Sequence, residues 1–280
     1  MSHSERSLIQ VHEPRFQQAE ERLRDVFDIS TVLNQGAREY QEDAILSEKP
    51  IGSDLGFVVL ADGMGGHAAG DVASNLIVCE VMKGWLAAGL NKDSSNSEVV
   101  AFLHDSAERA NKQIFEASRN DLNVKGMGAT LLILICIEDR AFWFSVGDSP
   151  LYLWRSGELI QLNEDHSMAP QIDMMAKLGM LDPDLARNHP DRNMLTSVIH
   201  GGDIAKIDCP SDPFKLLPDD VLIAASDGLQ FLEDKDIQEV VTRNHEVSCD
   251  AIADKLIRAL ISLDDPDQDN IAFSVAKVCS

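Results

Sequence analysis

The sequence has 280 residues, enough for one large domain or two small ones, and 44% of them are hydrophobic, which permits a substantial core. Asp and Glu number 47 against 24 Lys and Arg, so the formal net charge is −23. This charge excludes a general affinity for nucleic acid, which requires a basic surface, and is compatible with binding of divalent cations. Most of the carboxylates are expected only to solvate the surface.

The five cysteines are odd in number and contain no C-x-x-C pair, which indicates reduced thiols in a cytoplasmic protein. Residues 1–26 are polar and lack the apolar segment of a signal peptide, so we expect a mobile or helical N-terminal extension. The longest apolar run, residues 129–137, is too short to cross a bilayer, and no membrane partner is expected.

The first half of the remaining chain predicts two strands, residues 29–33 and 57–61, and then two amphipathic helices. The polar residues 91–97 separate the helices. The first helix is expected to bury one face with Val72, Leu76, Cys79 and Leu86, and the second a face with Val99, Leu103, Ala107, Ala110, Ile114 and Ala117.

The second half predicts a run of short strands, 130–137, 141–146, 151–155 and 158–162, with a hairpin at Ser156-Gly157. Such short turns require antiparallel strands. Residues 167–194 are expected to form an irregular insertion, or flap. A strand at 221–225, helices at 235–243 and 248–262, and a strand at 271–278 complete an α+β protein with antiparallel sheets covered by helices.

Three of the predicted strands run directly into an aspartate: Asp62-Gly63, Asp148 and Asp227-Gly228. A single Asp-Gly is most often just a turn. Three strand ends of one sheet system can converge, however, and clustered carboxylates repel one another unless cations lie between them. Ligands that are oxygen only favour Mg²⁺ or Mn²⁺ over zinc or copper.

A fourth acidic segment, residues 264–270, has D-x-D-x-D spacing but lacks the glycine and the final glutamate of an EF-hand, so we reject that interpretation. Asp264, Asp265 and Asp267 are expected to be solvated, whereas Asp269-Asn270 directly precedes the last strand. A competing motif at residues 63–68, Gly-Met-Gly-Gly-His-Ala, fits the dinucleotide fingerprint of an oxidoreductase. The abutting Asp62, and the lack of a strand ending in an acid about 20 residues later, weaken it.

Taken in order, the motifs resemble those of the bacterial branch of the protein phosphatase type 2C-like family over about residues 27–278. They comprise residues 36–43 (GAREYQED), 61–67 (ADGMGGH), 126–130 (GMGAT), 146–149 (VGDS), 164–167 (EDHS), 188–193 (NHPDRN), 226–228 (SDG) and 269–270 (DN).

The resemblance implies a four-layer αββα sandwich, with residues 1–26 as an extension, residues 27–280 as a single phosphatase domain and a flap at about 167–194. It further implies two core Mn²⁺ or Mg²⁺ ions and a third, weaker ion. Their ligands would be Glu42, Asp62, the Gly63 carbonyl, Asp148, Asp227 and Asp269. Catalytic roles would fall to Arg38, which would bind the substrate phosphate, to Asp43, which would orient a metal-bound water, and to Asp62.

The implied activity is hydrolysis of phosphoserine and phosphothreonine proteins, the substrates of a serine/threonine kinase. A hydroxide bridging the metals would attack phosphorus in line with no phosphoenzyme. We expect a cytoplasmic bacterial monomer that acts in signalling. The alternative is a catalytically weak, phosphatase-like module that binds phosphoproteins, which missing metal carboxylates would signal; every expected carboxylate is present.

The sequence departs from the family pattern at three positions. Met64 stands where some members carry a histidine proposed as general acid, which leaves His67 as a possible proton donor. Pro150 and Ser197 stand where arginines are common, which affects flap docking and substrate preference. His166, His189 and His200 lie in polar loops without the i, i+4 pairing of a zinc site, so we assign them structural roles.

Overall fold

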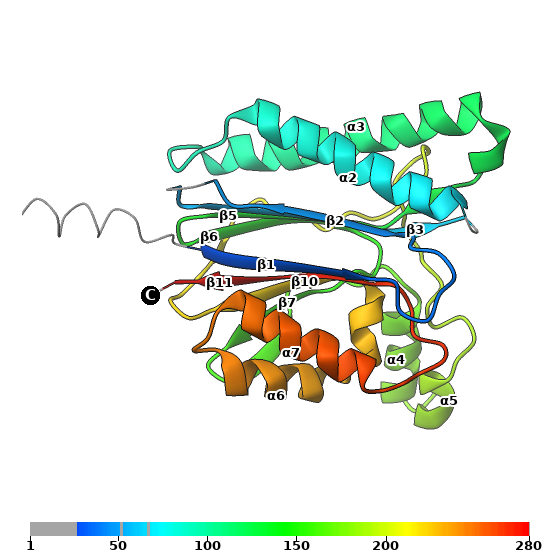
Figure 1. Cartoon of the computed structure of the whole chain (residues 1–280). Coiled ribbons are helices and arrows are strands. Elements are labelled where there is room, and N and C mark those ends of the chain that lie inside the picture. The colour runs from blue at the N-terminus through cyan, green and yellow to red at the C-terminus, as the bar shows by residue number, and fades with distance from the viewer. Residues whose placement is uncertain (1–26, 51–52, 66–67, 280) are drawn as a thin grey trace, which may run out of the picture.

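The computed structural model describes residues 27–50, 53–65 and 68–279, which form four layers in the order helices, sheet, sheet and helices (Figure 1). The expected α+β sandwich is therefore confirmed. The predicted extension, residues 1–26, lies outside the described residues. Within those residues, no helix combines the length and the apolar character needed to span a membrane.

Two antiparallel sheets form the centre of the sandwich. One sheet has the order β1 (Phe27–Asn34), β11 (Ile271–Val278), β10 (Val221–Ala225), β7 (Leu151–Arg155) and β8 (Glu158–Gln161). The other has the order β2 (Asp43–Glu48), β3 (Leu55–Met64), β5 (Leu131–Ile137), β6 (Arg140–Val146) and β9 (Phe214–Lys215), with β4 (Gly128–Ala129) paired to the end of β3.

Two helices cover each outer face of the sandwich (Figure 1). The β3 sheet carries α2 (Ala68–Ala88) and α3 (Asn96–Asn120), followed by η2 (Leu122–Val124). The β11 sheet carries α6 (Asp234–Asn244) and α7 (Cys249–Ile261), and η3 (Asp227–Phe231) directly follows β10. A capping box between Ser95 and Glu98 fixes the start of α3.

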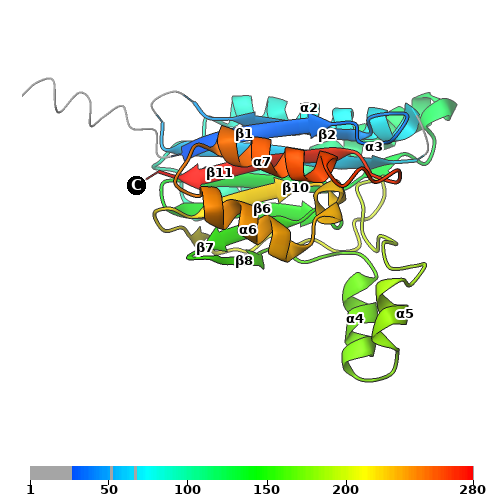
Figure 2. The ribbon, with the colours of Figure 1, turned by 60° about the horizontal axis from the view of Figure 1, so that its bottom comes forward.

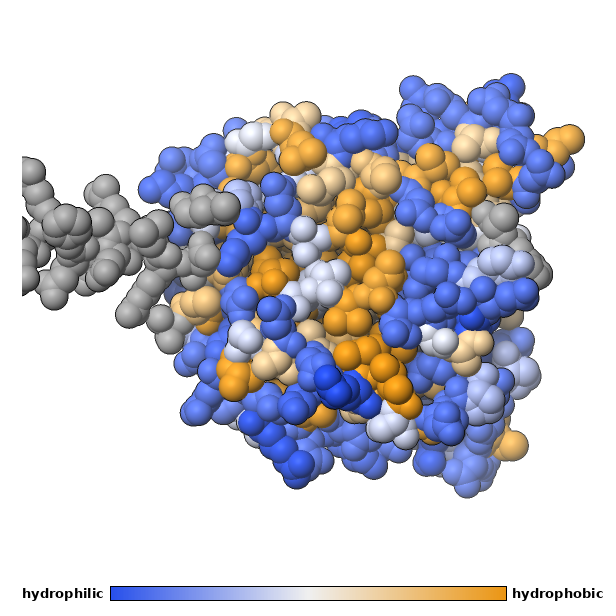
Figure 3. Space-filling view, in the orientation of Figure 1, coloured by the Kyte–Doolittle hydropathy of each residue, from blue (hydrophilic) through white to orange (hydrophobic). Residues whose placement is uncertain are grey.

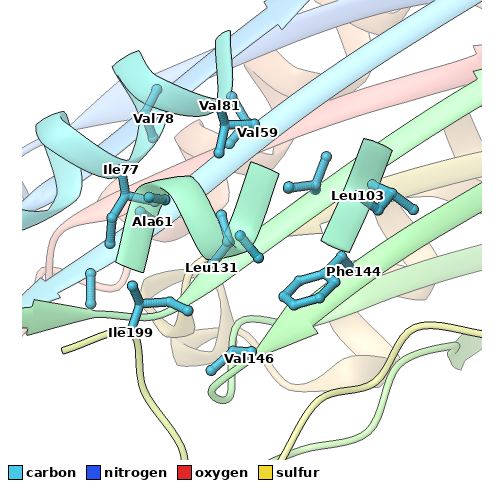
Figure 4. Packing of buried hydrophobic residues seen from close by; sticks show 14 of the residues in the cluster. Val59, Ala61, Ile77, Val78, Val81, Leu103, Leu131, Phe144, Val146 and Ile199 are labelled. Atoms are coloured by element: carbon cyan, nitrogen blue, oxygen red, sulfur yellow. The ribbon is translucent and has the colours of Figure 1, made fainter. Parts of the chain in front are cut away.

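Alternation along the strands divides the apolar residues between the layers. On β3, Val59 and Ala61 pack under the helices with Ile77 and Val81 of α2 (Figure 4), whereas Val58 faces the other sheet. The same period of two holds along the other central strands, because successive side chains of a strand point to opposite faces. The space between the sheets is therefore filled by one side of every central strand.

The buried face of α2 differs from the expected one. Val72 and Leu76 are partly buried against the core, but Cys79 and Leu86 are exposed. A different row of side chains faces the sheet instead: Ala69, Ala73, Ile77, Val81 and Trp85. The helix has apolar residues on several sides, so the spacing of Val72, Leu76, Cys79 and Leu86 was a poor guide to the buried face.

The flap also differs from the expectation of irregular structure, because it contains α4 (Ala169–Lys177) and α5 (Pro183–Arg187). These helices project from the sandwich in Figure 2. Each has a proline within its first turn, where the missing N–H has no intrahelical acceptor to lose. A bidentate ion pair joins Arg192, at the base of the flap, to Asp173 of α4, with N–O distances of 2.6 and 2.9 Å.

Both sheets end in an edge strand, β1 and β2, on the same side of the sandwich. Figure 3 shows an apolar band across this face. Exposed Leu33 of β1 and Leu46 of β2 line a groove there together with Val78 of α2. The remaining edge of the β3 sheet is the short β9.

The observed buried face of α2 predicts that truncating Ile77 and truncating Leu86 will change the free energy of unfolding by different amounts. Ile77 is 0% exposed and Leu86 is 66% exposed. We expect Ile77→Ala to lower the free energy of unfolding by about 2–5 kcal/mol, because it leaves a cavity. Leu86→Ala should change it by less than about 0.5 kcal/mol. Urea unfolding measures both, and equal losses would show that the assigned face of α2 is wrong.

Candidate functional site

The apolar layer between the sheets ends in two facing carboxylates. Asp62 continues the row of Val58 and Leu60 on β3, and Asp43 continues the row of Ile45 on β2. Asp43 and Asp62 are direct cross-strand partners. Contrary to the expectation of a tight turn at Asp62, β3 runs on to Met64, because Gly63 and Met64 pair with β4.

Hydroxyl side chains from the neighbouring strands hold this end of the sandwich in place. Ser226, next after β10, donates from Oγ to Asp43 Oδ2 at 2.7 Å. The Asp62 N–H donates to Thr130 Oγ1 at 2.9 Å, and Thr130 Oγ1 lies 2.8 Å from Ser149 Oγ. Thr130, Ser149 and Ser226 are all buried, so the Asp43 carboxylate and the Asp62 backbone are held by groups that cannot turn away into solvent.

Glu42 and Gly63 meet at the first turn of α2. The Gly63 N–H donates to the Glu42 carbonyl at 3.1 Å. A Cβ on Gly70 would lie 2.3 Å from Glu42 Oε1 and 2.9 Å from the Gly63 carbonyl oxygen, so both oxygens rest against the backbone of Gly70. Glycine is therefore required at position 70, because a larger residue would clash with these two oxygens. The positive end of the helix dipole also favours the Glu42 carboxylate at this position.

The opposite sheet contributes Asp227 and Asp269. Asp227 is the first residue of η3, and its carboxyl interacts with those of Asp62 and Asp269. Arg38 donates from Nη2 to Asp269 Oδ2 at 2.6 Å, and the Asn270 N–H donates to Asp269 Oδ1 at 2.7 Å. The Arg38 side chain is 53% exposed, so its guanidinium lies at the mouth of the cluster.

Asp148 lies in the turn that joins β6 to β7. This turn is a corner between the two sheets rather than a hairpin, since β6 and β7 do not pair with each other. Asp148 lines a cleft together with Asp165, Asp227 and Arg192, so the cleft lies between the acidic cluster and the base of the flap.

Burial and mutual repulsion shift these carboxyl groups towards their neutral forms. Loss of solvation, and then repulsion from Asp227, raise the pKa of Asp43 and of Asp148 from 3.8 to about 7, although the Ser226 hydrogen bond opposes the shift at Asp43. Loss of solvation and repulsion from Asp269 raise the pKa of Asp227 to about 6. Loss of solvation and repulsion from Asp43, Asp227, Asp148 and Asp269 raise the pKa of Asp62 well above 3.8.

The donor set fits hard divalent cations. Every group in the cluster offers oxygen, as Mg²⁺ and Mn²⁺ prefer, and Asp227 Oδ1 is buried with no hydrogen-bond partner among the described residues. Divalent cations would also remove the repulsion that raises the four pKa values. In the described part of the chain, no three His, Cys, Asp or Glu side chains are already arranged around one ion position.

The structure therefore brings together Arg38, Glu42, Asp43, Asp62, Gly63, Asp148, Asp227 and Asp269 at one end of the sandwich. The predicted proton donor His67 lies outside the described residues. Ser197 is buried, and its hydroxyl donates to the Lys206 carbonyl at 2.8 Å and accepts from the Lys206 N–H at 2.9 Å. Its side chain therefore stabilises the loop and does not line the cleft.

The dinucleotide hypothesis is incompatible with the topology. Gly63 lies inside a strand that pairs antiparallel on both sides, whereas the fingerprint belongs to a parallel βαβ unit. The acidic segment, by contrast, is as expected: Asp264, Asp265 and Asp267 are exposed.

Four residues of this region, Ser226, Thr130, Asn270 and Asp165, belong to the sequence motifs but had no predicted role. Ser226 directly follows the apolar run of β10 and Thr130 directly precedes that of β5, so the first polar residue beyond each run was the available signal. Asp165 lies in a loop, where no periodic pattern indicates which way a side chain points.

Comparisons with known proteins identify similar sequences and structures. The sequence profile described as Protein phosphatase 2C matches residues 35–180. The serine/threonine phosphatase stp of Listeria monocytogenes serotype 4b is 31% identical over 192 residues, which are 68% of this chain and 73% of the relative.

Solved structures are similar over most of the chain. The S. agalactiae serine/threonine phosphatase has a TM-score of 0.76 and 30% identity, covering 90% of this chain and 99% of that one. The catalytic domain of the serine threonine protein phosphatase PstP, solved in complex with two manganese ions, has a TM-score of 0.72 and 25% identity, covering 91% and 99%.

The raised pKa values predict how the stability of metal-free protein depends on pH. A carboxyl that binds its proton more tightly when folded adds stability that is complete below about pH 4 and is lost as pH rises to about 7. Asp43→Asn removes one such group. We expect its stability relative to the unsubstituted chain to increase by about 1 kcal/mol per pH unit between pH 5 and 7, measured by urea unfolding in a chelator.

Asp254→Asn is the matched control. Asp254 is a surface residue of α7 whose pKa is lowered by its hydrogen bond to Arg258, so it stays ionised throughout this range. Its stability difference from the unsubstituted chain should not vary with pH. If the stability difference of Asp43→Asn were also independent of pH, the raised pKa of Asp43 would be contradicted.

Proposed function

Because this chain belongs to the protein phosphatase 2C family, we propose that it is a metal-dependent protein serine/threonine phosphatase. Its substrates are phosphoserine and phosphothreonine side chains of other proteins. Its cofactors are two core Mn²⁺ or Mg²⁺ ions with a third, weaker ion.

The observation that supports this proposal most strongly is the shared location of the carboxylates with Arg38. Asp62, Asp148, Asp227 and Asp269 come from four separate segments, and their mutual repulsion is one cause of the raised pKa of Asp62. A fold maintains such repulsion only if something is gained from it, and the gain proposed here is the binding of cations. The guanidinium of Arg38 beside this cluster would attract an anion, such as the substrate phosphate.

We assign the core ligands to Asp62, Glu42 and the Gly63 carbonyl on one sheet, and to Asp227 and Asp269 on the other. Asp148, with Asp227, is assigned to the third ion. When bound, the ions supply a water whose pKa is lowered towards neutrality and positive charge that offsets the charge of the phosphate oxygens.

Two residues of the chain itself act on the reactants in this proposal. Arg38 binds the phosphate, because the planar guanidinium matches two phosphate oxygens, and it is held ready by its ion pair with Asp269 at 2.6 Å. Asp43, buried and hydrogen-bonded to Ser226 at 2.7 Å, would orient the attacking water.

A covalent intermediate on a cysteine is not supported by the surroundings of the buried thiols. Burial raises the pKa of Cys136 to about 12 and that of Cys249 further above its usual range, and both lie in the apolar core. A thiol of this kind is a poor nucleophile because the reactive form is the thiolate.

The proposal predicts Mn²⁺-dependent hydrolysis of p-nitrophenyl phosphate and of phosphothreonine peptides by the purified chain. Asp62→Asn and Asp227→Asn should each lower kcat/KM by at least about 100-fold, because each removes a ligand charge whose contribution is several kcal/mol. Initial rates with and without Mn²⁺ measure this effect.

Asp265→Asn on the exposed acidic loop serves as the matched control and should retain the full rate. Folded protein without turnover in Mn²⁺, but with retained binding of phosphopeptides, would favour a phosphoprotein-binding module instead. Full activity of either ligand variant would show that the ligand assignment is wrong.

A further inference from the structure

Asn270 makes three side-chain hydrogen bonds to a single loop. Its Oδ1 accepts the Glu42 N–H at 2.7 Å, and its Nδ2 donates to the Gln35 carbonyl at 2.8 Å and to the Tyr40 carbonyl at 2.9 Å. The residue is 4% exposed. One buried amide therefore spans residues 35–42, the connection from β1 to β2 that carries Arg38.

The same loop is tied internally to the position of Arg38. Gln35 Nε2 donates to the carbonyls of Arg38 and Glu39 at 2.8 and 2.9 Å. The Gln35 carbonyl is in turn held by Asn270. A continuous chain of hydrogen bonds therefore runs from the buried amide of Asn270, through Gln35, to the backbone of Arg38.

Close packing restricts the loop further. Gly36 has φ +62°, and a Cβ there would lie 2.0 Å from the Asp269 carbonyl oxygen. The Ala37 N–H donates to the Gln268 carbonyl at 2.9 Å. The loop thus lies directly on the segment that carries Asp269, the ion-pair partner of Arg38, so a small shift of the loop would move the guanidinium.

An amide is the side chain whose chemistry matches this position. It offers one acceptor to the Glu42 N–H and two donors to the two carbonyls. A carboxylate would keep the acceptor but would face both carbonyls with oxygen, and alanine would remove all three hydrogen bonds.

We propose that Asn270 is a positioning residue that sets the affinity for the substrate phosphate by holding Arg38 in place. This role rests on the proposed function, since it requires Arg38 to bind phosphate. It separates Asn270 from its neighbour Asp269, which is assigned to the metal site.

The test is a double-variant cycle with p-nitrophenyl phosphate as substrate and inorganic phosphate as competitive inhibitor. Asn270→Ala should raise KM and the phosphate inhibition constant by at least about fivefold in the unsubstituted chain. In the Arg38→Ala background it should change both by less than about twofold, because the group through which it acts is gone. A merely structural role would lower kcat equally in the two backgrounds.

Three further variants keep the test decisive. Gln35→Ala alters an exposed side chain and should reproduce the KM pattern even if Asn270→Ala folds poorly. Asn111→Ala removes a comparable amide clamp, between α3 and residues 201–202, and should leave both constants unchanged. Asn270→Asp keeps the acceptor for the Glu42 N–H but not the donors, so it should raise KM while keeping that amide protected.

Hydrogen exchange of metal-free protein provides a readout that does not depend on turnover. The Glu42 amide should exchange at least about tenfold faster in Asn270→Ala than in Asn111→Ala. Equal effects of Asn270→Ala on KM in both backgrounds, with normal turnover of the unsubstituted chain, would overturn this inference alone. No turnover by the unsubstituted chain would overturn the proposed function and this inference with it.

Discussion

The repulsion between Asp43 and Asp62 is the constraint on which the functional end of the sandwich depends. The two carboxylates are direct partners across β2 and β3, and both point into the space between the sheets, where their neighbours along each strand are apolar. Like charges placed opposite each other destabilise a strand pair. The register is nevertheless fixed, because a shift by one residue would turn the apolar row of each strand away from the core.

The surrounding structure limits this repulsion without removing it. Ser226 donates to Asp43, and Arg38 lies beside Asp227 and Asp269 on the other sheet. The pKa values of Asp43 and Asp148 remain raised to about 7, and that of Asp227 to about 6, so the metal-free protein is least stable when all of these groups are ionised. The carboxylates that destabilise the metal-free fold are thus the same groups that are proposed to bind cations, as is common at functional sites.

The sequence predicts strands and helices well where the pattern is strong, and side-chain contacts poorly. The ranges 151–155, 221–225 and 271–278 match β7, β10 and β11 residue for residue, since each is a mainly apolar segment. β2 was not predicted, because Asp43 begins it and its apolar core is only three residues long. Motif order identified the clustered carboxylates, whereas the Asn270 clamp depends on contacts between residues more than 200 positions apart, which local patterns do not encode.

Calorimetric titration of Mn²⁺ into metal-free protein tests the central claim most directly, namely that these carboxylates form one cation site. Metal binding must displace the protons that the raised pKa values retain. Titrations in buffers with different ionisation enthalpies should therefore show net proton release that is greater at pH 6 than at pH 8, and Asp62→Asn should abolish tight binding. Binding without proton release at pH 6, or unchanged binding by Asp62→Asn, would contradict the account.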